Sequence, residues 1–411
     1  MATPNVPVQQ APRMTPQAQD GIATRAILSQ AVDRIQLVAS EQVFPASNPV
    51  LIIQPINVGL IKRFTIIVTG TITNTGTAQI DLTSFGLANI FGQGGIQYTD
   101  LNNYLRVNTS GAHLTMLAQA KRRRAYASCV DDSEPGTNPF SLNFQSKMLN
   151  VAPASWPVFV APGFIAAGSS GQFTARFELP MSYTDDDLRG AVWANVLNAV
   201  QQITLTFNTQ AVTSDPQDFN FSVYHSTAAG GSGSITSATV TVYQEYLDQL
   251  PKANTNGVVT TILPALSLST VYELKSTLFT AITANQEFFI PYANQRSFIS
   301  TFMSFNHDGT ATGTAFSQDI NYLALLAANA SYIWKVEPLT IVAKSRDHMN
   351  SDLPLGTYYF PSRRRNIATL QFGNLQLVLN ANTATPSGYA NVMWEAFALQ
   401  NTLQSGASLA S

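Results

Sequence analysis

Four histidines, His113, His225, His307 and His348, are the first residues to consider for metal binding or acid–base chemistry. No two of them have the spacing of metal ligands on one helix or strand, and no cysteine pair accompanies them. Cys129 is the single cysteine, which excludes an internal disulfide. We therefore expect no metal site, and we interpret Cys129 as a small buried apolar residue.

Three consecutive carboxylates at Asp185, Asp186 and Asp187 could bind a cation or supply a carboxylate pair for acid–base catalysis. The same residues follow Thr184 with the spacing of a helix N-terminal cap, in which side chains satisfy free backbone N–H groups. Acidic side chains also suit the positive end of a helix dipole. We therefore interpret this run as the start of a helix rather than as a site.

Two further patterns typical of enzymes are incomplete. The glycine-rich stretch at residues 92–95 lacks the Gly-Lys-Ser/Thr that completes a phosphate-binding loop, so we expect a turn there. No serine stands in the Gly-x-Ser-x-Gly arrangement of a nucleophile elbow. The sequence thus predicts no catalytic residue, no cofactor-binding residue and no metal ligand, and we expect the chain not to be an enzyme.

Two basic clusters could bind the phosphate groups of nucleic acid or lipid. The clusters consist of Lys121, Arg122, Arg123 and Arg124 in one run and Arg363, Arg364 and Arg365 in the other. They could equally pair with acidic residues of a neighbouring subunit or be solvated, and this second interpretation is the one that we favour. The formal net charge of −2 and a pI near 6.1 argue against a nucleic-acid-binding protein.

The composition also bounds the organisation of the chain. Its 411 residues suffice for two or more domains with cores of their own. Charged residues make up only 11% of the chain, against roughly 25% in typical soluble proteins, so much of the surface must be neutral. A neutral surface favours a protein whose faces are covered by copies of itself. The polar residues 1–10 do not resemble a signal peptide, so we expect synthesis in a reducing cytosol.

The elements that must carry these residues are mainly strands. Alternating apolar and polar residues at 64–69, 173–177, 203–207 and 239–242, separated by clusters of Gly, Asn, Ser and Thr, predict a sandwich or barrel. Few helices are expected. One begins at Thr15 and Pro16 and carries an apolar stripe of Leu28, Ala31, Ile35 and Val38. Another begins at Thr184, and two more lie within residues 320–330 and 338–346.

The second half of the chain repeats the first. Three segments recur in the same order: residues 100–105 at 319–323, residues 114–122 at 339–346, and residues 237–247 at 389–399. Three ordered matches predict two copies of one domain. The polar stretch at residues 251–257 marks the boundary, and the first copy carries a long insertion between Arg122 and Ile203.

Several stretches resemble the major capsid proteins of tectiviruses, which are tailless bacteriophages with an internal membrane. The stretches are Val-Tyr-Gln-Glu-Tyr-Leu-Asp-Gln-Leu-Pro at residues 242–251, Pro-Ile-Asn-Val-Gly at 55–59, Asp-Leu-Arg-Gly-Ala-Val at 187–192, Asp-Ile-Asn-Tyr-Leu at 319–323 and Thr-Leu-Gln-Phe-Gly-Asn at 369–374. They span almost the whole chain in order. The family has no catalytic residues, so none are transferred to this sequence.

The resemblance implies an all-β fold of two tandem eight-stranded jelly rolls with a few short helices and an N-terminal helical arm. Residues 1–45 would form the arm and helix, 46–250 the first jelly roll, 251–264 a linker, 265–402 the second jelly roll and 403–411 a tail. Three chains would form a pseudo-hexagonal homotrimer. Such trimers would tile an icosahedral shell around an internal membrane, beside other capsid and vertex proteins. The arm would touch the membrane peripherally, and no direct genome binding is expected.

Two other classes of protein are compatible with a duplicated all-β chain. A two-domain β-sandwich carbohydrate-binding protein is the first alternative, and it would be retained on a sugar resin. A glycoside hydrolase is the second, and it would need two carboxylates facing each other at roughly 5 to 9.5 Å. Nothing in the sequence favours such a pair.

Overall fold

Long antiparallel strands dominate the chain, as their alternating sequence predicts. The computed structural model describes residues 15–399 except 84, 123–127, 131–158, 197–198, 210, 214–221, 227–229, 256, 283–284, 307–319, 328–330, 350–355, 362–366, 369–373 and 383–387. Within these residues no helix is long and apolar enough to cross a membrane.

The first jelly roll consists of two facing sheets. One has the order β1 (Val32–Val43), β15 (Gly233–Asp248), β3 (Leu60–Asn74), β10 (Ser170–Pro180), β8 (Phe159–Ala161) and β7 (Ser128–Val130), with β11 (Val192–Trp193) also paired to β3. The other begins with β2 (Val50–Ile53), β12 (Gln202–Thr206), β5 (Ile96–Thr99) and β6 (Leu105–Thr109). A smaller sheet of β13 (Val212–Thr213), β14 (Tyr224–His225), β4 (Ile80–Leu82) and β9 (Phe164–Ile165) accompanies them, as does the short helix η1 (Gly86–Ile90).

The second jelly roll repeats this arrangement. Its first sheet has the order β18 (Thr270–Ile282), β26 (Gly388–Leu399), β20 (Arg296–Asn306) and β23 (Thr357–Pro361), with β24 (Ile367–Ala368) also on β20. Its second sheet has the order β19 (Glu287–Pro291), β25 (Gln376–Ala381), β21 (Ile320–Ala327) and β22 (Ser331–Val336). In both jelly rolls the last strand lies between the first and third strands, so the predicted duplication holds at the level of topology.

The duplication extends to the helices and bulges. A 12-residue helix follows β6 and β22, namely α2 (Gly111–Arg122) and α5 (Pro338–Met349). The hairpin before each helix carries a bulge at the same place. The pairs on either side of the bulge are Tyr98–Val107 and Thr99–Leu105 in the first jelly roll, and Leu325–Trp334 and Leu326–Tyr332 in the second. Bulges are defined features of a fold, so these positions align the two copies.

A second bulge aligns the other sheets. Between β3 and β15, one extra residue separates the pairs Arg63–Glu245 and Ile61–Tyr246. Between β20 and β26, one extra residue likewise separates the pairs Ser300–Glu395 and Phe298–Ala396. Glu245 and Glu395 therefore hold equivalent positions in the two jelly rolls.

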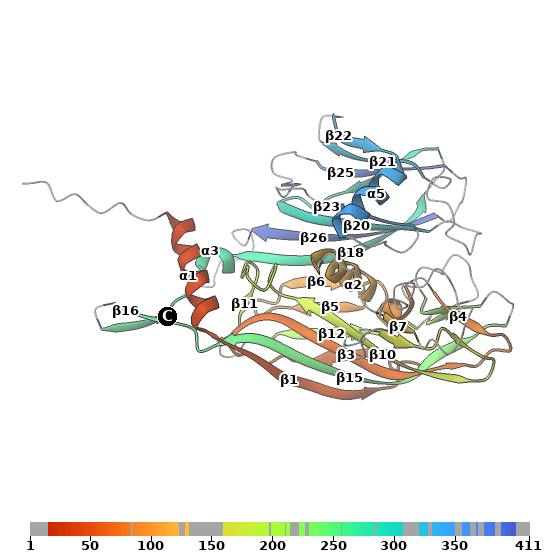
Figure 1. The fold of residues 1–411 in the computed structure, drawn as a ribbon, viewed down its shortest axis with the longest axis horizontal. Helices are drawn as coiled ribbons and strands as arrows, with labels where there is room; N and C mark the ends of the chain where they lie inside the picture. Colours follow the sequence, from red (N-terminus) through yellow and green to blue (C-terminus); the bar gives the residue numbers. More distant parts are fainter. Residues whose placement is uncertain are drawn as a thin grey trace, which may run out of the picture.

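The two jelly rolls lie side by side and share a sheet, with the second above the first in Figure 1. Strand β6 of the first runs parallel to β18 of the second, with Val107 opposite Leu274 and Asn108 opposite Lys275. Helix α2 lies at this contact and also touches α5. We call the contact of β6 and α2 with the outer face of β18, β26 and β20 the joint.

Three apolar clusters hold the chain together. The largest fills the first jelly roll and continues across the joint to buried residues of the second, namely Tyr272, Leu274, Ile299, Phe302, Tyr359, Met393 and Phe397. A separate cluster fills the second jelly roll. The third lies under the N-terminal helix, where Ile27 packs with Leu60, Leu188, Leu247 and Leu250. The joint is thus built like a core rather than like a loose contact between domains.

The N-terminal helix is shorter than the sequence suggested. Helix α1 (Pro16–Gln30) begins as predicted, with the Thr15 side chain accepting a hydrogen bond from the Ala18 backbone N–H. The predicted extension through Ile35 and Val38 is wrong, because residues 32–43 form β1 and pair along their length with β15. Ile35 and Val38 satisfied a helical spacing, yet sheet pairing determined the structure.

Two other predicted helices are also corrected. Residues 184–187 form a bend without a helix, and Ile320–Ala327 is strand β21. Alignment by the bulges also overturns the first sequence repeat, because residues 100–104 lie between β5 and β6 whereas Ile320 begins β21. The other two repeats correspond to α2 with α5 and to β15 with β26. The helix predicted at 338–346 is confirmed as α5.

The segment between the jelly rolls is not an unstructured linker. Strands β16 (Lys252–Thr255) and β17 (Val258–Thr261) form a hairpin that projects at the same end of the molecule as α1 (Figure 1), and α3 (Ala265–Leu268) then leads into β18. Asp20 of α1 ties this end together, since its carboxylate accepts a hydrogen bond from the Ser267 hydroxyl at 2.6 Å. The insertion predicted between Arg122 and Ile203 lies partly outside the described residues.

Candidate functional site: the joint and the exposed faces

His113 is a buried structural residue. It lies on α2, its Nδ1 shares a hydrogen bond with the Thr109 hydroxyl, and its ring packs edge-on against Phe302 at 5.7 Å between centroids. Burial lowers the pKa of His113 to about 3, so the ring is neutral. No group of three His, Cys, Asp or Glu residues within the described part of the chain could hold a metal ion.

The other histidines are dispersed. His225 lies in β14, and burial lowers its pKa. His348 lies on α5 with its Nε2 3.5 Å from the Tyr359 hydroxyl, and His307 lies outside the described residues. The three histidines that the structure describes thus lie on three different elements, α2, β14 and α5.

The acidic run at residues 185–187 binds arginines of its own chain. The Asp187 carboxylate accepts hydrogen bonds from the Arg189 guanidinium, the shortest at 2.6 Å, and one from the Arg189 backbone N–H at 3.1 Å. Asp185 lies 3.3 Å from the guanidinium of Arg63. These carboxylates therefore stabilise a bend next to the joint, although the predicted helix is absent there.

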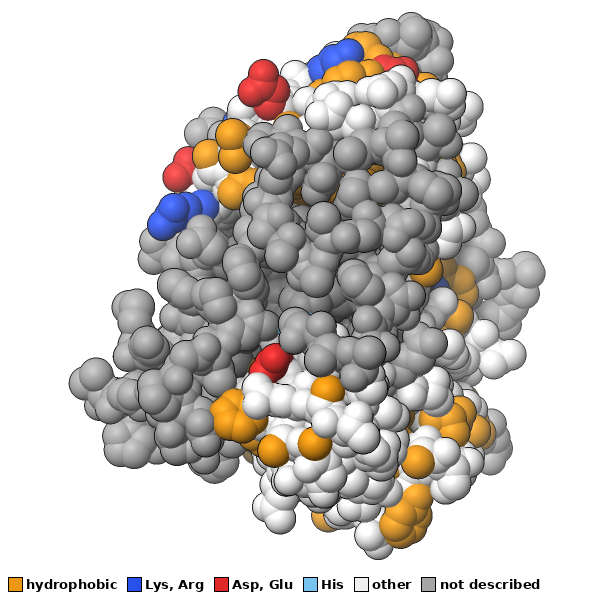
Figure 2. Space-filling view, turned by 90° about the vertical axis from the view of Figure 1, so that its right-hand side faces the viewer, with side chains coloured by type: hydrophobic (Ala, Val, Ile, Leu, Met, Phe, Trp, Pro, Cys, Tyr) orange, Lys and Arg blue, Asp and Glu red, His pale blue; other side chains and the backbone are white. Residues whose placement is uncertain are grey.

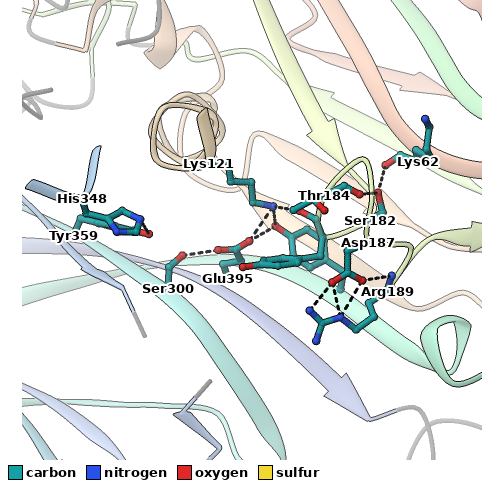
Figure 3. A network of polar contacts seen from close by, with 12 residues as sticks. Lys62, Lys121, Ser182, Thr184, Asp187, Arg189, Ser300, His348, Tyr359 and Glu395 are labelled. Carbon is teal, nitrogen blue, oxygen red and sulfur yellow. Dashed lines mark hydrogen bonds and ion pairs between the residues drawn. The ribbon is translucent and has the colours of Figure 1, made fainter. Parts of the chain in front are cut away.

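Lys121 and Glu395 form the centre of the joint (Figure 3). The Lys121 ammonium on α2 lies 3.0 Å from Oε1 of Glu395 on β26. It also donates to the Tyr183 carbonyl and the Tyr272 hydroxyl, both at 2.7 Å. Tyr272 donates to Glu395 at 2.6 Å and Ser300 donates to its other oxygen at 2.7 Å. Lys121 thus pairs within its own chain. The sequence had instead favoured a contact with a neighbouring subunit or with solvent.

The charge of Glu395 is compensated from both jelly rolls. Burial acts to raise the pKa of Glu395, but Lys121 and the hydroxyls of Tyr272 and Ser300 outweigh it and hold that pKa below its usual value. A buried carboxylate with both oxygens bonded holds its partners in fixed directions. The pair therefore fixes how α2 lies on the second jelly roll.

A second buried ion pair lies within the first jelly roll, at the bulge of β6. The Arg106 guanidinium lies 2.6 Å from the Asp100 carboxylate, and both side chains are almost fully buried. Arg106 also donates to the carbonyl of Gly190 at 2.8 Å. The other Asp100 oxygen accepts the backbone N–H groups of Asn102 and Tyr104. Arg106 is the extra residue of the β6 bulge, and the bulge directs this side chain to Gly190 within the first jelly roll.

A third polar contact joins the edge of the first jelly roll to the second. The Tyr104 hydroxyl donates to Glu273 of β18, and Arg296 of β20 lies 2.5 Å from the same carboxylate. Burial and the Glu273 carboxylate raise the pKa of Tyr104 to about 12. The Tyr104 hydroxyl therefore stays protonated at physiological pH and serves as a donor.

Residues 92–95 form the expected turn, in which Gly95 N–H donates to the Gly92 carbonyl at 2.9 Å. Cys129 lies in β7 opposite Val160. Arg122 ends α2, whereas Arg123, Arg124 and residues 363–365 lie outside the described residues.

Sequence reasoning missed Glu395, Tyr272 and Arg106. Each stands in an apolar or alternating run that predicts a strand, and nothing in its spacing marks a contact between domains. One signal was available for Glu395: a carboxylate in the middle of the apolar residues 392–398 needs a buried partner.

Exposed apolar side chains gather on particular elements. They include Ile22 and Leu28 on α1, Ile35 and Leu37 on β1, Val50 and Ile52 on β2, Val258 and Val259 on β17, and Leu339 on α5. On the end of the molecule shown in Figure 2, Lys, Arg, Asp and Glu atoms occupy only small parts of the described surface. Exposed apolar side chains on edge strands of a chain with few charges are typical of contact surfaces between proteins.

Solved structures with this fold are viral coat proteins. The chain is similar to the crystal structure of the STIV MCP, with a TM-score of 0.59, 12% identity, and coverage of 92% of this chain and 100% of that one. It is similar to the atomic structure of Sulfolobus Turreted Icosahedral Virus, with a TM-score of 0.56, 12% identity and coverage of 89% and 91%. The fold is therefore that of the double jelly-roll capsid proteins.

The chain belongs to the P3 major capsid protein family. The family's N-terminal domain matches residues 6–250 and its C-terminal domain matches residues 269–411. The chain is 33% identical to the major capsid protein P3 of Enterobacteria phage PRD1 over 395 residues, which are 95% of this chain and 93% of that protein. It is thus a structural protein of the virion capsid, which associates with itself, and it is not an enzyme.

Proposed function

We propose that three copies of this chain form a pseudo-hexagonal homotrimer that tiles an icosahedral shell around an internal membrane. The observation that supports this most is the duplication: each chain supplies two lobes of the same topology, side by side. Three such chains in a ring present six similar lobes. The chain divides into these lobes at the β16–β17 hairpin, within residues 251–264, and the first lobe includes β1.

Light scattering of the purified protein tests the trimer. We expect a mass three times the 44.4 kDa of one chain at micromolar concentration. Obligate contacts of this kind bury upwards of about 2,000 Å², so dilution should not release monomers readily. A monomeric mass at micromolar concentration would contradict the proposal.

The N-terminal arm is proposed to lie at the inner side of the shell. The end of the molecule that carries α1 also carries the β16–β17 hairpin, with exposed Ile22, Leu28, Val258 and Val259. Residues 1–14, which precede α1 in the sequence, would touch the membrane peripherally, while other capsid and vertex proteins would meet the trimer elsewhere. The net charge of −2 supports a shell that does not bind the genome directly.

A further inference from the structure

The outer face of the first jelly roll carries a groove whose lining is polar but uncharged. The groove has a volume of about 490 Å³ and crosses β1, β15, β3 and β10 toward the end of the molecule that carries β4 (Figure 1). This volume lies within the roughly 300–1,000 Å³ that small-molecule sites occupy. One row of its lining, with the four side chains opposite one another on these strands, consists of Gln42, Thr239, Thr69 and Thr174. We call this feature the hydroxyl groove.

A second row extends the same chemistry along the sheet. Ser237, Thr71 and Gln172 stand opposite one another on β15, β3 and β10. The side chains of both rows point away from the core, because residues that alternate with them, such as Val68 and Val240, are fully buried. Among the described residues, no charged side chain lines the groove.

The polar side chains of the two rows are free to bind a ligand. Within the described part of the chain, none of them takes part in a hydrogen bond or an ion pair. The hydroxyls on either side of the groove are paired with each other instead. The Thr73 hydroxyl lies 2.9 Å from that of Ser170, and the Ser40 hydroxyl lies 3.4 Å from that of Thr241. The groove therefore presents unused donors and acceptors in the middle of a face whose other hydroxyls are occupied.

The groove lies past the part of this face that is covered in the second jelly roll. Because the bulges place the two jelly rolls in register, Thr241 is the counterpart of Asn391. Asn391 pairs with Leu278 on β18, which is 38% exposed, so the joint no longer fully covers the sheet at this row. Both rows of the groove lie beyond Thr241 on the side away from α1. A contact built like the joint would therefore leave the hydroxyl groove open.

We propose that the hydroxyl groove binds a neutral carbohydrate. Hydroxyl and primary amide groups both donate and accept hydrogen bonds, and so do the hydroxyls of a sugar. An anionic ligand would need lysine or arginine, and a divalent cation would need carboxylates. An apolar ligand would cover the lining and leave its polar groups without partners. Because the lining stands on paired strands, its groups are held in fixed positions before a ligand arrives.

The direction in which the groove faces rests on the proposed shell, whereas binding needs only the first jelly roll. Strand β3 begins at Leu60, which packs under α1, and Thr69 lies about 30 Å further along it at 3.3 Å per residue. With α1 on the inner side of the shell, the groove lies toward the outer side. The neutral carbohydrate that reaches it there is a polysaccharide of a cell surface.

Saturation-transfer difference NMR of the purified full-length protein tests the class of ligand. The neutral probes are cellotetraose, isomaltotetraose and the tetramer of N-acetylglucosamine, and a heparin tetrasaccharide is the anionic control. We expect at least one neutral probe to bind with a dissociation constant of about 1 mM or lower, and the heparin probe not to bind. Failure of all three neutral probes to bind, or stronger binding of heparin, would overturn the proposal.

Paired substitutions test the site. The variant Thr71→Val/Thr239→Val removes one hydroxyl from each row and keeps the side-chain shape and the strand propensity, so its affinity for the bound probe should fall about tenfold or more. The matched control Thr73→Val/Thr241→Val changes the same two strands on the same face outside the groove, and it should keep the affinity of the unmodified protein. An unchanged affinity in the first variant, or equal losses in the two, would show that the carbohydrate does not bind in the groove.

Closed shells test the direction of the groove. Shells should bind the same probe on beads as the free oligomer does, and binding by the free protein alone would contradict a groove that faces outward. Light scattering of the same sample reports separately on the trimer. A monomer that binds the probe would contradict the proposed trimer and leave the groove in place, whereas a trimer that binds no neutral probe would contradict the groove alone.

Discussion

At the scale of single residues, Glu395 shows how a charge can be buried between two domains. One oxygen of its carboxylate contacts Lys121 and Tyr272, and the other oxygen accepts a hydrogen bond from Ser300. The absence of catalytic motifs was inferred from sequence alone, and family membership establishes that the protein is not an enzyme. The sequence could not predict the Lys121–Glu395 pair, because its members are separated by most of the chain and only the topology brings them together.

Lys121→Met should destabilise the protein by roughly 3 kcal/mol, at the low end of the range for removing one partner of a buried ion pair, because Tyr272 and Ser300 still donate to Glu395. The matched control is Arg34→Met, which breaks the half-exposed Arg34–Asp248 pair and should cost less than about 1 kcal/mol. Urea unfolding at a fixed protein concentration measures both. Equal effects would show that the joint does not depend on Lys121.

His113 should make the protein less stable as the pH falls from 6.5. An unfolded histidine takes up a proton near its ordinary pKa of 6.5, whereas folded His113 does so only near 3. The unfolded state therefore binds more protons in this window. The stability that neutral His113 contributes is complete above about pH 6.5 and decreases toward pH 3, by up to about 1.4 kcal/mol per pH unit.

The variant His113→Gln removes this titration. We expect its free energy of unfolding, measured by urea titration between pH 4 and 7, to depend less steeply on pH than that of the unmodified protein, whatever its value at neutral pH. An identical slope in the two proteins would show that His113 is protonated in the folded state.

At the scale of elements, alternation predicted the strands well and the helices unevenly. Helix α1 was located by its Thr15 cap and α5 was predicted at residues 338–346, whereas its counterpart α2 was not predicted as a helix. The run at residues 320–327 contains alanine and leucine, which favour a helix, but pairing with β25 and β22 makes it a strand. Residues 32–43 were misassigned because Ile35 and Val38 satisfy a helical spacing. Their strand pairing depends on β15, some two hundred residues away, and no local signal reports it.

Gly190 should be among the least tolerant positions in the bend that supports the joint. It has φ +85°, and a Cβ there would lie 2.3 Å from Cβ of Tyr272. Gly190→Ala should cost roughly 1–3 kcal/mol from the backbone conformation, with the clash added. Gly168→Ala is the control, since it has φ +67° but no atom within 4 Å of the added Cβ, and thermal or urea unfolding should rank it as the milder change. The reverse order would mean that Tyr272 moves away easily.

Deleting residues 1–14 should leave the trimer intact and weaken the link between shell and membrane. This deletion stops before Thr15, which caps α1, so the helix and its packing on Leu247 and Leu250 remain. Light scattering of the trimer and co-sedimentation of shells with vesicles measure the two effects. A longer deletion through residue 40 would remove most of β1 and unfold the sheet, so it cannot report on the arm. Loss of the trimer in the 1–14 deletion would contradict a role confined to the membrane.

At the scale of the whole molecule, duplication explains both the fold and the proposed assembly. The sequence indicated two copies through weak repeats, one of them misaligned, and the bulges at Arg106 and Ile333 now place the copies in register. The same register makes exposed Ile35 the counterpart of Leu274, which is buried at the joint.

Electron cryomicroscopy of the purified oligomer tests this account most directly. We expect closed rings of three chains with six similar lobes. A ring with another number of chains would contradict the account. So would an assembly in which identical faces of two chains meet.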